Sequence, residues 1–206
     1  AVAPAATAVA AAVAPAATAV AVPQAQPVAT SAPSVVATGK PEGTLNIGWK
    51  ELGTFGTHPR LYHLSFGGSV GATIAESLVS QSRTSFVPLL AKEWSISPDG
   101  LVWTFKLQEG VPFHQGYGEM TAEDVIYSIQ QAGAEGSSYP VSGQLRRLWN
   151  NEDGWVKALD DYTVQVHTGT LQYDMLGIMG PPYGGWIVSK KQVDELGEEA
   201  ADFNGA

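Results

Sequence analysis

The clearest alternation of apolar and polar side chains in this sequence lies between residues 94 and 107. After the run Pro98-Asp99-Gly100, large apolar residues occupy every second position. This period of two predicts a strand with one strongly apolar face, made of Leu101, Trp103, Phe105 and Leu107. Proline fixes its own φ and glycine accepts a positive φ, so the run predicts a tight turn. The segment therefore predicts a β-hairpin, whose first strand carries the apolar pair Trp94 and Ile96.

A helix is predicted to begin directly after Thr121. The Thr121 hydroxyl is placed to accept a hydrogen bond from the amide of Asp124, and the acidic side chains of Glu123 and Asp124 favour the positive end of a helix. Met120 and Val125 have the spacing of a hydrophobic staple across that end. The buried stripe of the helix is expected to consist of Val125, Ile126 and Ile129.

Weaker patterns predict the other elements. In chain order they are a strand over Thr44–Trp49, a helix over Ser69–Ser80, a second hairpin over residues 155–166 around Asp160-Asp161, and a helix capped by Ser189 that ends near Gly197 or Ala200. Residues 132–151 form a glycine-, serine- and proline-containing stretch with a short apolar-basic piece over Leu145–Trp149, and residues 175–186 form a bent segment. This mixture of strands and helices predicts the α+β class.

The first 39 residues differ in composition from the rest of the chain. They contain no charged residue, and an 11-residue unit rich in alanine, valine and proline occurs twice in succession. Small side chains bury too little surface to offset ordering entropy, and prolines interrupt helices, so residues 1–42 are predicted to be a disordered tether. A transmembrane helix over residues 1–22 is the alternative; alanine is only marginally apolar, and no basic flank precedes the stretch.

Charge and cysteine content exclude several classes of function. The formal net charge is −9, which argues against nucleic acid as a partner because phosphate neutralisation needs clustered Lys and Arg. The chain has no cysteine, so disulfides, thiol catalysis and thiolate metal sites are excluded. The chain begins with Ala1 and shows no charged segment ahead of an apolar run, so we expect that a signal segment is not part of it.

No catalytic or metal-binding motif emerges from the polar residues. The four histidines lack the paired spacing of a zinc site, since His58 and His63, the nearest two, are five residues apart in a predicted loop. Adjacent carboxylates such as Glu123-Asp124 and Asp160-Asp161 do not converge on one point and are expected at a helix start and a turn. No Gly-x-Ser-x-Gly elbow is present. We therefore predict neither catalytic residues nor a metal site.

Five short motifs follow one another in a fixed order. They are Leu90–Trp94, Asp99-Gly100, Trp103–Leu107, Gly110–His114 and Thr121–Val125. In this order they resemble the family 5 extracellular solute-binding proteins of ABC importers, the oligopeptide, dipeptide and nickel-binding type. Further similarity lies at Gly43–Trp49, Glu76–Val79, Asp160–Val164 and Ile187–Lys191. One departure is Gln115–Glu119, where the family usually has a short Asp-Gly link.

The resemblance implies a periplasmic-binding-protein-like class II fold of two lobes, α/β overall. This chain would hold the start of lobe one and its small subdomain, as an N-terminal fragment. The expected divisions are a tether over residues 1–42, the first strand and loop of lobe one over 43–68, the small α+β subdomain over 69–188, and the start of the return into lobe one over 189–206.

The resemblance also implies a function. The protein would capture a peptide or similar small solute by closure of two lobes and deliver it to ABC transporter permease subunits, as an extracytoplasmic monomer without a cofactor. Family members are often anchored through a lipidated cysteine. The positions that match ligand-contacting residues of relatives are Glu51, Leu52, Gly53, Thr54 and Tyr139. A tethered structural or adhesive domain and, less favoured, a hydrolase remain the alternatives.

Overall fold

The computed structural model describes residues 43, 44, 46, 58–61, 74–149, 155–180, 183 and 185–197. Two compact units are distinguished, residues 1–46 and residues 47–206, and all described helices and strands lie in the second. The predicted tether and most of the predicted strand over Thr44–Trp49 lie outside the described residues. No helix among the described residues is long and apolar enough to cross a membrane.

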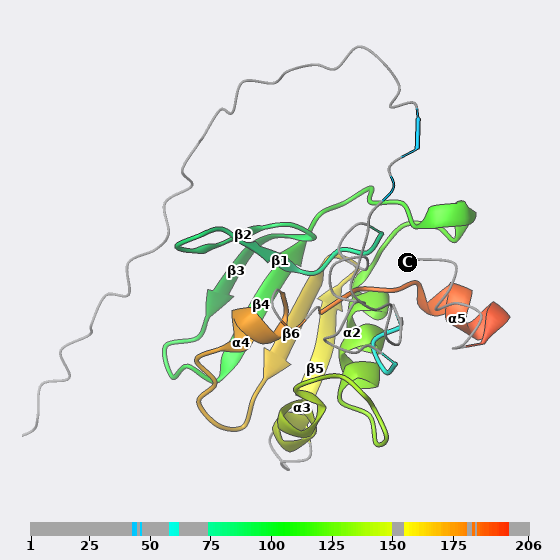
Figure 1. Ribbon diagram of the computed structural model, residues 1–206. Helices are drawn as coiled ribbons and strands as arrows, with labels where there is room; N and C mark the ends of the chain where they lie inside the picture. The colour runs from blue at the N-terminus through cyan, green and yellow to red at the C-terminus, as the bar shows by residue number, and fades with distance from the viewer. Residues whose placement is uncertain are drawn as a thin grey trace, which may run out of the picture. The chain divides into compact units, whose positions relative to one another are not determined.

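A four-stranded antiparallel sheet forms the centre of this unit (Figure 1). Its strands, in spatial order, are β3 (Ala91–Ile96), β4 (Val102–Leu107), β6 (Thr163–His167) and β5 (Trp155–Asp160). A separate two-stranded sheet consists of β1 (Val79–Gln81) and β2 (Phe86–Pro88). The helical elements are η1 (His114–Gly116), α2 (Ala122–Ala132), α3 (Ser142–Trp149), α4 (Met175–Ile178) and α5 (Lys190–Leu196).

The first predicted hairpin is confirmed by β3 and β4. Trp94 pairs with Phe105 and Ile96 pairs with Trp103 across the hairpin. Gly100 adopts the positive φ of 76° that the turn requires, and its amide donates to the carbonyl of Ser97. Trp103, Phe105 and Leu107 are buried as the alternation predicts, whereas Ile96, next to the turn of the hairpin, is 40% exposed.

Helix α2 begins at the predicted residue with a capping box. The Asp124 carboxylate accepts hydrogen bonds from the Thr121 amide at 2.9 Å and from the Thr121 hydroxyl at 3.2 Å. Met120 and Val125, the expected staple, are both fully buried. The stripe is confirmed for Val125 and Ile129, while Ile126 is only half-buried. Helix α2 packs against β5 and β6, so it covers the same sheet that the two hairpins build.

The second hairpin and the last helix are also confirmed. β5 and β6 pair with Val156 opposite Val166 and Ala158 opposite Val164. The Ser189 hydroxyl accepts from the Gln192 amide at 3.2 Å and so caps α5, which ends where Gly197 takes a φ of 82°.

The predicted helix over Ser69–Ser80 is wrong at its C-terminal end. Val79–Gln81 form strand β1, and Ser77 pairs with Trp186 in an isolated bridge. The Ser77 hydroxyl donates to the carbonyl of Val79 at 2.8 Å, a local bond that competes with helix formation. Adjacent Leu78 and Val79, where β1 begins, are both fully buried, so their apolar spacing does not distinguish a strand from a helix.

Helix α3 was not predicted from the sequence. It includes Gly143, and the preceding glycine, serine and proline residues are typical of loops. Its apolar residues Leu145 and Leu148 are nevertheless three apart and buried against the core. Burial of these two leucines, together with the contact between α3 and β5, overrides the weak local preference.

Two glycines lie where a side chain has no room. A methyl group added to Gly180 would lie 2.6 Å from the carbonyl oxygen and 2.8 Å from a methyl of Val79 in β1. Gly185 has a φ of 61°, and a methyl group added to it would lie 2.8 Å from the nearest backbone atom of Met179. The chain after α4 can therefore approach β1 because Gly180 lacks a Cβ, and it can fold back on Met179 because Gly185 lacks one.

We expect Gly180→Ala to lower the free energy of unfolding by about 2 kcal/mol, because overpacking a close backbone contact costs roughly 1–3 kcal/mol. Gly143→Ala in α3 is the matched control. Its added methyl meets nothing within 4 Å, so helix propensity predicts a gain of about 0.5 kcal/mol. Urea unfolding of both variants measures the sign of the change in the free energy of unfolding for each. Equal free energies of unfolding in the two variants would contradict the packing argument.

Candidate functional site

Four of the five predicted ligand-contacting residues lie outside the described part of the chain. Glu51, Leu52, Gly53 and Thr54 precede the described turn at residues 58–61. Their role in ligand binding stays a prediction.

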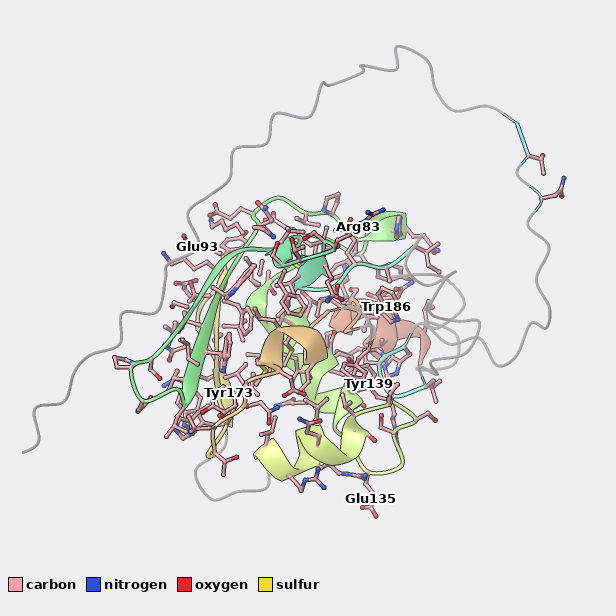
Figure 2. The ribbon with its side chains drawn as sticks, turned by 60° about the vertical axis from the view of Figure 1, so that its left-hand side comes forward. Arg83, Glu93, Glu135, Tyr139, Tyr173 and Trp186 are labelled. Atoms are coloured by element: carbon pink, nitrogen blue, oxygen red, sulfur yellow. The ribbon has the colours of Figure 1, made fainter. Side chains whose placement is uncertain are left out.

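Tyr139 is described, and its side chain is buried, with 3% exposed. Its hydroxyl donates to the carbonyl of Ile178 at 2.8 Å, which joins the loop before α3 to α4. A small apolar cavity of about 20 Å³ lies beside it, lined in part by Leu145 and Trp186. Figure 2 shows Tyr139 close to α3, whereas Glu135 projects away from the fold. The structure therefore gives Tyr139 an internal hydrogen bond, and a ligand contact by this residue stays a prediction.

The turn at residues 58–61 is fixed on α2 by a buried histidine. His58 is 1% exposed, its Nδ1 accepts from the amide of Arg60 at 3.3 Å, and its Nε2 lies 3.2 Å from the hydroxyl of Tyr127. Because Nδ1 accepts this hydrogen bond, a neutral ring carries its hydrogen on Nε2, which then donates to the Tyr127 hydroxyl. The amide of Ser138 also donates to the carbonyl of Arg60 at 2.8 Å.

This arrangement was not anticipated from the sequence, where His58 was considered only as a metal ligand. Both ring nitrogens face protein partners, and no group of three or more metal-ligating side chains occurs among the described residues. The isolated histidine in a predicted loop carried no sign of its partner, because Tyr127 lies 69 residues further along the chain. The structure therefore assigns His58 to the attachment of this turn.

A polar cleft of about 470 Å³ lies between the start of α2 and helix α5. It is lined by Tyr117, Glu119, Glu123, Asp124, Lys190, Lys191, Asp194 and Glu195. Lys190 pairs with Asp194 at 2.6 Å and with Glu123 at 3.8 Å, and the hydrogen bond to Asp194 raises the pKa of Lys190. Lys191 lies 4.0 Å from Glu195. Both lysines of the cleft thus form exposed ion pairs, although five carboxylates face these two lysines, and exposed pairs of this kind are typical of a solvated surface.

The loop with the unusual sequence Gln115–Glu119 is attached to the second hairpin by one carboxylate. Glu119 accepts from the hydroxyl of Tyr162 at 2.6 Å and from the amide of Gly110 at 2.5 Å. The hydrogen bond to Tyr162 lowers the pKa of Glu119, and the same bond raises the pKa of Tyr162 from 10.0 to about 12. The longer loop therefore carries its own attachment point.

The family model of bacterial extracellular solute-binding proteins, family 5 (middle), matches residues 85–205. This chain belongs to that family. The match confirms the resemblance drawn from the ordered motifs, and it places the chain among solute-binding proteins, a family that is not one of enzymes.

Individual relatives agree with this family 5 assignment. The chain is 28% identical to di/tripeptide-binding protein 2 of Pseudomonas aeruginosa, over 53% of this chain and 24% of that protein. It matches the periplasmic binding protein DppA of Helicobacter pylori, solved with the peptide STSA, with a TM-score of 0.56 and 29% identity over 70% of this chain and 31% of the other. It matches MoaA of A. tumefaciens R10, solved with mannopinic acid, with a TM-score of 0.60 and 29% identity over 70% and 29%.

These matches confirm the α+β fold as part of a periplasmic binding protein. The chain spans about a quarter of the length of the di/tripeptide-binding relative and about 30% of the two solved structures. The predicted division into tether, lobe start, subdomain and return segment stays a prediction.

We expect the Glu119–Tyr162 bond to leave a signature at both ends of the pH scale. A lowered carboxyl pKa adds stability that is present above the unfolded value near 4.5 and lost as pH falls through the folded value. A raised tyrosine pKa adds stability that is present below 10.0 and lost as pH rises towards about 12.

Tyr162→Phe should therefore remove one late-titrating group from the tyrosinate absorbance titration and flatten the loss of stability above pH 10.0. Tyr173→Phe, at a side chain 85% exposed, is the control and should leave the late phase in place. If Tyr162→Phe does not alter the late phase, the hydrogen bond is not formed in solution.

Proposed function

We propose that this protein is the solute-binding component of an ABC importer, which captures a peptide or similar small solute between two lobes and delivers it to permease subunits. The observation that carries this proposal is the family 5 match over residues 85–205 together with the structural similarity to solute-bound periplasmic proteins. Closure captures the solute because the solute contacts both lobes only in the closed state and so shifts that population. The protein works outside the cytoplasm, as a monomer and without a cofactor.

Within this proposal, the loop at Glu51–Thr54 supplies one side of the solute site. A carboxylate at Glu51 pairs with the amino group of a peptide, and extended backbone at Leu52–Thr54 bonds the peptide in the manner of an added strand. The attachment of His58 to Tyr127 supports this role, because it fixes the chain four residues beyond Thr54 to the rigid helix α2. A loop held at a nearby point loses less entropy when it orders around a solute.

Two solute classes are distinguished by the relatives. Di/tripeptide-binding protein 2 and the H. pylori protein solved with STSA favour a peptide, while the protein solved with mannopinic acid favours a small organic acid. We favour a peptide, because peptide-binding proteins recur among the relatives.

We expect short peptides to raise the melting temperature of the natural-length protein, because ligand that binds only the native state adds RT ln(1 + [L]/Kd), about 2.7 kcal/mol at a hundredfold excess over Kd. A thermal-shift panel of di- to pentapeptides and mannopinic acid identifies the class. Glu51→Gln should weaken peptide affinity roughly tenfold through loss of one charged pair. Glu135→Gln, at an exposed side chain that projects away from the fold, is the control (Figure 2). No shift with any compound would contradict the proposed solute classes.

We also expect residues 40–206 alone to bind peptide poorly, since the proposed trap needs contacts from both lobes. Titration calorimetry of this segment with the best peptide from the panel measures the affinity. Micromolar binding would show that one lobe suffices and would overturn the closure mechanism.

A further inference from the structure

The segment that joins α4 to α5 is bound along both of its sides. On one side, Trp186 pairs with Ser77, and the amide of Ile187 donates to the carbonyl of Glu76 at 2.9 Å. On the other side runs helix α2, and α2 and α5 are in contact. The orange segment in Figure 1 and the labelled Trp186 in Figure 2 show its course. Residues 186–189, which lead into helix α5 at Lys190, thus have a backbone partner on one side and a helix on the other.

The helix side supplies hydrogen-bond acceptors from two side chains. The Ser128 hydroxyl oxygen accepts from the amide of Val188 at 3.0 Å, and Oδ1 of Asp124 accepts from the amide of Lys190 at 2.9 Å. The amides two residues apart point to the same side of an extended chain and are separated by about 6.6–6.8 Å. Side chains four residues apart on a helix lie one above the other with a rise of about 6.0 Å. Asp124 and Ser128 therefore match the spacing that a neighbouring strand would present.

The side chains of Asp124 and Ser128 are both buried, and their polar atoms all form hydrogen bonds. Ser128 is 2% exposed, and its hydroxyl also donates to the carbonyl of Asp124 at 2.8 Å, so it has one donor and one acceptor role. Asp124 is 8% exposed, and its other oxygen, Oδ2, accepts from the amide and hydroxyl of Thr121. One carboxylate thereby satisfies amides at the starts of both α2 and α5, where helices leave N–H groups without partners.

We propose that Asp124 and Ser128 are positioning residues that set the register of residues 186–190 on α2. This register sets the direction in which the chain continues into lobe one, one of the two lobes that contact the solute in the proposed function. The capping box of α2 joins Asp124 to Thr121 and engages only Oδ2 of the carboxylate, so the Oδ1 contact to Lys190 and the Ser128 contact to Val188 lie outside the capping box. The consequence for solute binding rests on the proposed function, whereas the register itself does not.

The test compares Asp124→Asn and Ser128→Ala with Thr121→Ala in the natural-length protein. Asparagine retains the size of the side chain but offers only one accepting oxygen, so Thr121 and Lys190 compete for it. Ser128→Ala leaves the buried amide of Val188 without an acceptor. Thr121→Ala removes the hydroxyl contact to Oδ2 and leaves both contacts to residues 188 and 190 in place.

Hydrogen exchange followed by mass spectrometry separates the two roles. In Asp124→Asn and Ser128→Ala, peptides covering residues 186–191 should exchange roughly tenfold faster, the effect of one lost buried hydrogen bond, while peptides from β4 are unchanged. In Thr121→Ala, the exchange rate relative to the parent protein should be no higher for residues 186–191 than for β4. Unchanged exchange of residues 186–191 in both Asp124→Asn and Ser128→Ala would overturn the proposal.

Solute binding provides the second readout. The quantity compared is the dissociation rate of the peptide selected by the thermal-shift panel. Each variant is measured at the same number of degrees below its own melting temperature. The peptide should dissociate from Asp124→Asn several-fold faster than from Thr121→Ala. Faster exchange with an unchanged dissociation rate would overturn the link between register and capture. If no peptide binds the parent protein, the proposed function fails while the exchange experiment still decides the register.

Discussion

The burial of one face of β4 is the constraint on which the rest of the structure depends. β4 pairs with β3 on one side and with β6 on the other, so the β4–β6 pairing joins the two hairpins into one sheet. Phe105 and Leu107 are completely buried, and full burial of such side chains contributes roughly 1.5–3 kcal/mol each. Val125 and Ile129 of α2 and Met175 and Ile178 of α4 belong to the same core. The hairpins and helices therefore share one stabilising centre.

Polar contacts then determine how the chain enters and leaves this centre. The turn at residues 58–61 is attached through His58 and Tyr127, and the segment over residues 186–190 is attached through Asp124 and Ser128. Both attachments use side chains of α2. In the proposed importer component, this one helix would fix two connections between the sheet and the residues that contact solute, while the sheet itself provides rigidity.

The parts of the fold that the sequence predicted correctly are those whose signals are local. The Asp99-Gly100 turn, the alternation up to Leu107 and the cap at Thr121 lie within a few residues of the structure they specify. The errors arose where distant partners decide. Ser77–Gln81 are extended because they pair with β2 and Trp186, and α3 forms because Leu145 and Leu148 are buried. The same holds for the candidate site: nothing near His58 or Tyr139 in the sequence indicates Tyr127 or the Ile178 carbonyl as partners.

Helix α2 presents side-chain hydrogen-bond acceptors at the spacing of a strand. Such a helix tolerates an inserted residue less well than a strand does. One inserted residue between Asp124 and Ser128 would turn Ser128 by about 100° around the helix axis and carry its hydroxyl away from residues 186–190. A strand edge repeats its backbone donors and acceptors at every second residue along its length, so a similar insertion could be absorbed as a bulge. The stretch from Thr121 to Ser128 should therefore tolerate exchange of its outward side chains, while its residue count is set by the segment that it binds.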